Sequence, residues 1–165
     1  MSPQDQTLLE DLLDSWDRNN TILVNLLHAV PEEGLEVRAM PGSPSVAEMF
    51  THMHYVRLVF ISEDAPDFPV DVPETEWQSE RNRNRMAAML NESAKAVRDV
   101  AKSRLDTSRP MKLHYDHPLL FLQHMIWHEG YHHGQIKLAL KLAGHPVSDE
   151  EAGPITWGVW MRKSK

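Results

Sequence analysis

Residues 118–144 constrain the fold of this 165-residue chain more than any other part of the sequence. The segment opens at Pro118, which suits the first turn of a helix. It closes at Gly144, with Pro146 just beyond, which is a strong stop signal. Between these ends, apolar side chains cover most of the circumference of a helix. A helix that is apolar all round is buried on more than one side. The segment therefore predicts a long helix packed within a larger helical assembly.

Three other segments show the apolar spacing of helices. We expect helices over about 3–30, from Ser45 to just before residue 63, and over about 75–106. The stretches SVAE at Ser45 and TEWQ at Thr75 both fit a capping box at a helix start. Proline-rich stretches separate the segments, and no segment alternates apolar and polar residues convincingly enough for a strand.

These patterns predict an all-α fold, a four-helix bundle with long loops between helices 1 and 2, 2 and 3, and 3 and 4. A short C-terminal tail follows, and its two tryptophans should dock on the bundle. The length is that of one domain, so we expect a single domain over residues 1–165.

The composition limits which partners and which metal ligands this chain can have. The chain has 24 acidic and 17 basic residues and no long basic run, which argues against nucleic acid as a partner. It has no cysteine, so a bound metal must be held by histidine nitrogen or carboxylate oxygen. We find no signal peptide pattern and no apolar stretch of about 18 residues, and we expect a cytoplasmic protein that makes no contact with a membrane.

Histidines at metal-ligand spacing lie on the last predicted helix. His128 and His132 are four residues apart, so both rings can face one small volume and hold a zinc, nickel, iron or manganese ion. A third ligand must come from another element, and periodicity alone does not choose between His52 and His54. His124 lies one turn earlier, but a helix drifts by about 40° over four residues, so we expect it beside the ion rather than on it.

The same stretch, HEGYH, fits the H-E-x-x-H signature of metallopeptidases, in which Glu129 would be the general base. The extended form of that signature fails because position 138 is Leu. A peptidase is therefore a minor alternative. Glu129 and Glu48 are candidates to orient a ligand imidazole, or are simply solvated. Trp127 and Gln135 are candidates for the surroundings of the site.

Two stretches together resemble the DinB/YfiT-like superfamily of metal-binding four-helix bundles. They are SVAEMFTHMHYV at 45–56 and HMIWHEGYHHGQIKLALKLAGHPV at 124–147. The matching positions are Ser45, Glu48, His52, His128, His132, Gly134, Gln135, Ile136 and Gly144. The resemblance implies a metal held by His52, His128 and His132. Position 133, often arginine in such proteins, is histidine here.

The resemblance also implies a homodimer. Some members of the superfamily are thiol-dependent isomerases or S-transferases, so the resemblance also implies a reaction that uses a low-molecular-weight thiol. We therefore expect a divalent-metal-dependent transferase, isomerase or hydrolase acting on a small molecule. The alternative is a non-catalytic metal-binding or stress-related bundle. A dimer is also favoured by the second apolar face of 118–144, where Gly130 and Gly134 would let a neighbouring backbone come close; the alternative is a deeply packed helix of a monomer.

Overall fold

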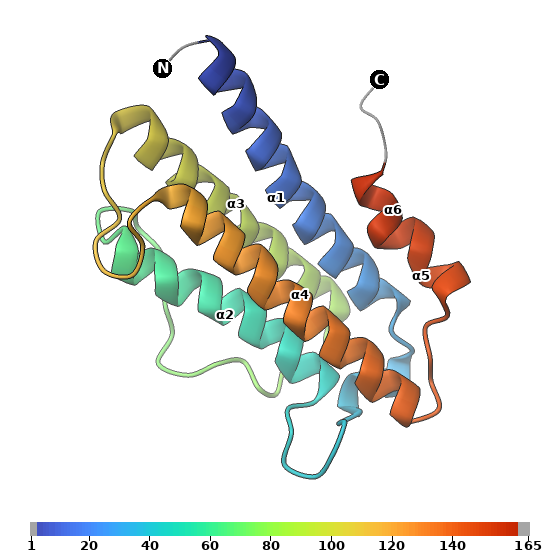
Figure 1. The fold of residues 1–165 in the computed structure, drawn as a ribbon. Helices are drawn as coiled ribbons and strands as arrows, with labels where there is room; N and C mark the ends of the chain where they lie inside the picture. Colours follow the sequence, from blue (N-terminus) through green and yellow to red (C-terminus); the bar gives the residue numbers. More distant parts are fainter. Residues whose placement is uncertain (1–2, 162–165) are drawn as a thin grey trace.

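Four long helices form a bundle in the computed structural model, which describes residues 3–161 (Figure 1). The all-helical prediction is confirmed, since the described range contains no β-strand beyond an isolated bridge between Arg38 and Ser45. None of its helices combines the length and the apolar character needed to span a membrane. The elements in chain order are α1 (Pro3–Ala29), the 3-10 helix η1 (Glu32–Glu36), α2 (Val46–Asp64), α3 (Arg83–Thr107), α4 (Pro118–Leu142), α5 (Asp149–Ile155) and α6 (Trp157–Trp160).

Helices α1 and α2 lie on opposite sides of the bundle, and each packs against both α3 and α4 (Figure 1). The chain therefore crosses the end of the bundle between α1 and α2, through residues 30–45. It also crosses the outside of α2 through residues 65–82. This order makes α2 and α4 direct neighbours, which is what the predicted metal site requires.

Helix starts and stops follow the expected chemistry at α2 and α4. The hydroxyl of Ser45 accepts the backbone N–H of Glu48, and the Glu48 carboxylate accepts the backbone N–H of Ser45, which completes the predicted capping box. The His117 side chain accepts the backbone N–H of Leu119 at the start of α4. After α4, Gly144 adopts a φ of 83°, the left-handed conformation that glycine takes without strain.

The predicted start of the third helix is wrong. Helix α3 begins at Arg83 with Asn82 as its cap, not at Thr75. The expected capping box of Thr75 and Gln78 starts no helix, and the carboxylate of Glu76, which lies between them, binds the ring of His52. The next residue, Trp77, packs its ring 4.8 Å from that of His54. These contacts with α2 hold residues 75–78 in a non-helical path, so tertiary contact overrides the local signal.

The C-terminal tail is helical and docks on α1. Arg18 donates to the backbone carbonyl of Val159, and Asn25 donates to that of Ile155. Val159 is buried, whereas Trp157 and Trp160 remain 44% and 40% exposed. The tail is thus attached as expected, but mainly through its backbone and Val159 rather than through burial of both indole rings.

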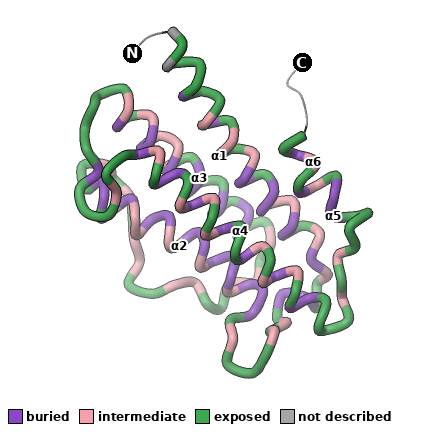
Figure 2. Tube along the Cα trace, in the orientation of Figure 1, coloured by how far each residue is buried: buried purple, intermediate pink, exposed green. Residues whose placement is uncertain are grey.

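The interior divides into two apolar clusters, seen as buried stretches along the helices in Figure 2. One cluster includes Leu23, Phe50 and Ile136, and the other includes Trp16 and Phe121. A layer of buried polar side chains separates them, with members from every long helix: Asn19, Asn20, Arg57, Ser93 and Glu129.

The centre of this layer is an ion pair between α2 and α4. Nε of Arg57 lies 2.6 Å from Oε1 of Glu129, and Nη2 lies 2.8 Å from Oε2, while both side chains have no exposed surface. Nη1 of Arg57 donates to Asn20, Ser93 and the backbone carbonyl of Leu90. A buried charge pair is tolerated only when hydrogen bonds satisfy both partners, and here they do.

We predict that Glu129→Gln lowers the free energy of unfolding by about 3 kcal/mol, because the substitution leaves the Arg57 guanidinium buried without a counter-charge. Urea denaturation measures this change. The exposed Glu32→Gln serves as a control and should shift it by less than about 0.5 kcal/mol. Equal stability of the two variants would contradict a structural role for the pair.

Candidate metal centre

Three histidine side chains converge between α2 and α4. On α4, the four-residue spacing places Nε2 of His128 3.1 Å from Nε2 of His132. Two ligands of a tetrahedral zinc ion would lie about 3.3 Å apart, given Zn–N distances of about 2.0–2.1 Å. His52 comes from α2, and its ring centre lies 5.5 Å from that of His128 and 5.1 Å from that of His132. One ring nitrogen from each of the three lies within 4.8 Å of the others, so this group could hold a metal ion.

Burial prepares two of these rings for metal binding. It lowers the pKa of His128 to about 4, with the rings of His132 and His52 adding to the effect, and it also lowers the pKa of His132. A metal binds only the neutral imidazole, so protons compete weakly for these two nitrogens near neutral pH.

Glu76 is a member of the site that the sequence analysis missed. Its Oε1 lies 3.0 Å from Nδ1 of His52. A carboxylate on the second nitrogen of an imidazole fixes the ring and makes its other nitrogen a better ligand. The contact leaves Nε2 of His52 for an ion. The sequence analysis did not assign this role to Glu76, because the TEWQ stretch fits a capping box equally well.

A small cavity lies beside the histidines. Its volume is about 170 Å³, and its walls come from the start of α2 and from the segment that follows α2. The lining residues include His52, His132, Glu76, Gln78 and Met49. A metal ion held by three protein ligands has coordination positions left for water or substrate, and this cavity gives them space.

Glu129, predicted as a possible general base, is not at the histidine cluster. It follows His128 by one residue, so its side chain points about 100° away around α4. There its carboxylate accepts hydrogen bonds from Arg57 and also from Asn19. The signature residue for peptidase chemistry is therefore an element of the core.

Glu48 lines the cavity, but Arg38 engages it. Both guanidinium Nη atoms lie 2.8 Å from its carboxylate oxygens, and this pairing holds the pKa of Glu48 below its ordinary value. The structure therefore places Glu48 near the site as a helix cap and as the ion-pair partner of Arg38. The carboxylate that binds Nδ1 of His52 is that of Glu76.

The remaining predicted neighbours lie around the α4 histidines. His124 stands one turn from His128, with ring centres 6.3 Å apart, and its Nδ1 lies 2.7 Å from the hydroxyl of Tyr115. Gln135 donates to the hydroxyl of Tyr131. Trp127 is 69% exposed, so it is a surface residue rather than a wall of the cavity.

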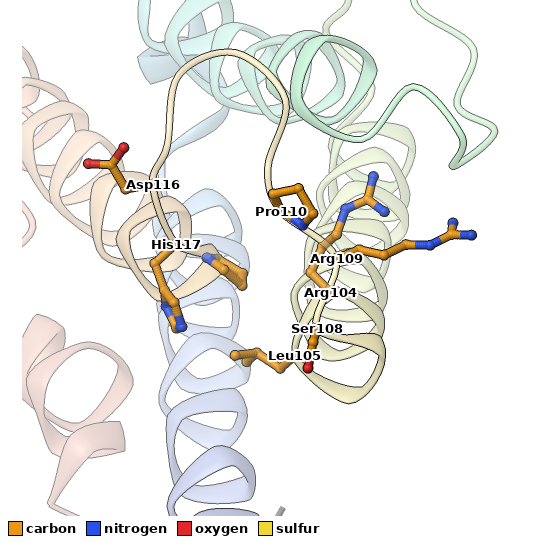
Figure 3. A pocket seen from close by; sticks show the side chains of 8 residues that line it. Arg104, Leu105, Ser108, Arg109, Pro110, Asp116 and His117 are labelled. Carbon is orange, nitrogen blue, oxygen red and sulfur yellow. The ribbon is translucent and has the colours of Figure 1, made fainter.

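Another cavity, of about 370 Å³, lies between the end of α3 and the start of α4. Figure 3 shows the guanidinium groups of Arg104 and Arg109 turned away from Asp116 and His117, on the other side of the cavity. Both arginines bind the carboxylate of Asp67. The two arginines thus share one carboxylate in a structural ion pair, and no histidine of the metal centre lines this cavity.

The bundle and its three convergent histidines define a class of protein, the helical bundle with a candidate metal centre between neighbouring helices. A sequence model of the DinB family matches residues 1–151, and the chain belongs to that family. Neither a curated protein nor a solved structure matches the chain.

We predict that Glu76→Gln weakens divalent metal binding by about tenfold, because the neutral amide makes His52 a poorer and less fixed ligand. Competition with a chelating dye measures the affinity. Glu74→Gln, two residues earlier on the exposed side of the segment, is the matched control and should bind as the wild type does. Equal affinities of the two variants would contradict the assigned role of Glu76.

We also predict that the metal-free protein is less stable at pH 5 than at pH 7. The pKa values of His54 and His128 are about 4 in the folded chain, below the ordinary value of 6.5. The unfolded chain therefore takes up protons that the folded chain does not, and stability present above pH 6.5 is lost as the pH falls toward 4. With a discount for the partial exposure of His128, the loss at pH 5 is about 2 kcal/mol. Urea denaturation of the metal-free protein measures it, and a stability that is flat or higher at pH 5 would refute it.

Proposed function

We propose that the chain is a divalent-metal-dependent enzyme that acts on a small molecule as an S-transferase, isomerase or hydrolase. The observation that carries this proposal is the cavity of about 170 Å³ that opens onto His52 and His132. It supports binding of a small molecule at the coordination positions that three histidines leave free. A zinc, nickel, iron or manganese ion there would act as a Lewis acid or lower the pKa of a bound water or thiol.

A low-molecular-weight thiol is the proposed co-substrate for the transferase and isomerase reactions. The chain has no cysteine, so it supplies no thiol of its own, and S-transfer requires an external one. A peptide substrate is disfavoured, because Glu129 is buried against Arg57 and cannot act on a bound water.

A non-catalytic, metal-binding bundle is the second candidate. One observation favours it: the two carboxylates that line the cavity, Glu48 and Glu76, are engaged by Arg38 and His52. Neither is free to serve as a general base in this arrangement.

Metal analysis of the purified protein tests the site. We expect about one divalent ion per chain in the wild type, and loss of that ion in the triple variant His52→Ala, His128→Ala, His132→Ala. The exposed His28→Ala is the control and should keep the ion. Full metal content in the triple variant would exclude the proposed ligands. Thiol-transfer and hydrolase assays on the loaded wild type then separate the enzyme from the non-catalytic bundle.

A homodimer is part of the proposal. Five large apolar side chains recur along α4 at alternating spacings of seven and four and are all at least 46% exposed: Leu120, Trp127, Tyr131, Leu138 and Leu142. Apart from adjacent residues and the backbone of α4 itself, no heavy atom would lie within 4 Å of a Cβ at Gly130 or Gly134, so the surface beside this stripe is open. An exposed apolar stripe of this kind favours association, and a second copy offers the same stripe.

We predict that light scattering gives a mass twice the 19.0 kDa of one chain. The double variant Trp127→Glu, Leu138→Glu should run as a folded monomer, because charges disrupt the apolar contact. Leu8→Glu, at an exposed leucine of α1, should leave the mass unchanged. A monomeric wild type would refute the dimer. We also propose a cytoplasmic location, which suits a chain that has no cysteine to form disulfides.

A further inference from the structure

A stretch of chain without helix or strand borders the metal centre. Residues 71–80, which we call the strap, run along the outside of α2 between the end of that helix and the start of α3 (Figure 1). Within the described structure, none of residues 66–82 is buried. The backbone N–H groups of Gln78 and Glu80 bond to carbonyls of the strap itself. Segments with so little burial belong to the least stable parts of a fold and open locally.

Both ends of the strap are attached to the bundle. Just before it, Val70 packs against one of the two apolar clusters, and the carboxylate of Asp67 binds Arg104. Just after it, Arg81 pairs with Glu36 in the 3-10 helix. The strap can therefore swing away from α2 and return while the helices on either side of it keep their places.

The middle of the strap is held by few contacts. A cavity of about 490 Å³, rather than packed side chains, separates part of it from α2 and α3. Two contacts join it to α2. Oε1 of Glu76 lies 3.0 Å from Nδ1 of His52, and the ring of Trp77 lies 4.8 Å from that of His54. One of these two contacts thus ends on a histidine that is placed to bind the metal.

Metal binding strengthens the contact between Glu76 and His52. A neutral imidazole carries its proton on either nitrogen, and His52 donates to the carboxylate only when that proton is on Nδ1. An ion on Nε2 leaves Nδ1 as the place for the proton and fixes this tautomer. The side chains of His52 and Glu76 are 34% and 27% exposed, so the contact is weak until the ion fixes it.

We propose that the strap is a metal-operated lid on the small cavity beside the histidines. Glu76 and Gln78 form part of the wall of that cavity, so opening of the strap removes this wall. An ion bound to His52 holds the strap closed and completes the space into which its free coordination positions face. This inference rests on the metal centre of the proposed function and on no particular reaction.

The size of the effect follows from the predicted role of Glu76. Coupling between two binding events is reciprocal. If the contact with Glu76 raises the metal affinity about tenfold, the metal must shift the strap toward its closed position by the same factor of about ten.

The test is the rate at which chymotrypsin cuts the full-length protein after Trp77, with and without zinc. At a low protease concentration this rate follows the population of the open form. We expect zinc to slow the cut about tenfold in the wild type. The cut after Leu113, which is 67% exposed in the segment before α4, is the internal control. It reports general stabilisation by zinc and any effect of zinc on the protease, and it should slow by less than about twofold.

Variants separate the lid from metal binding itself. In Glu76→Gln, zinc should slow the cut after Trp77 by less than about twofold, because the carboxylate that holds the strap is gone. Glu74→Gln, an exposed position of the same strap, is the matched control and should behave as the wild type does. Each variant is measured at a zinc concentration that saturates it, as shown by competition with a chelating dye, so that a weaker affinity is not read as an open strap.

Four results would overturn the proposal. A wild type that binds zinc but is cut after Trp77 at an unchanged rate would remove the lid and leave the metal centre intact. Equal slowing of that cut in Glu76→Gln and in the wild type would mean that Glu76 does not hold the strap. Equal slowing of the cuts after Trp77 and Leu113 would mean that zinc stabilises the whole chain alike. A wild type that binds no zinc would remove the metal centre and the lid together.

Discussion

The ion pair between Arg57 and Glu129 is the interaction on which the rest of this bundle depends. It is fully buried, and it joins the two helices that carry the histidines. An arginine and a carboxylate bind in a fork geometry that tolerates little sliding, whereas apolar side chains pack in many registers. The pair therefore fixes α2 against α4 along their length. Its cost of desolvation is offset by Asn19, Asn20 and Ser93, which come from the other two long helices.

The register set by this pair brings His52 opposite the α4 histidines. His128 precedes Glu129 by one residue, and His132 follows it by three, so their rings lie on an adjacent face of the same helix turns. That face is directed at α2 and the short segment beyond it. Glu76 reaches the outer nitrogen of His52 from that segment. The buried pair of Arg57 and Glu129 thus fixes the two helices against each other, and Glu76 fixes the ring of His52.

Much of this arrangement could be predicted from the sequence, because the signals were local. Capping at Ser45 and the stop at Gly144 depend on neighbouring residues, and so does the four-residue spacing of His128 and His132. His52 was chosen over His54 only by the family resemblance. The start of α3 and the role of Glu76 could not be predicted, because the contact with α2 that decides them joins residues 24 apart. The sequence alone could have predicted that Glu129 does not face the same way as His128, since adjacent helical residues point about 100° apart.

The central claim is that three imidazoles from two helices can hold one ion. X-ray absorption of the zinc-loaded protein tests this most directly, because it reports the type and distance of the atoms around the metal. The account predicts three histidine nitrogens at about 2.0–2.1 Å, with the remaining positions filled by oxygen. A first shell with one imidazole or none, and oxygen in the other positions, would contradict it.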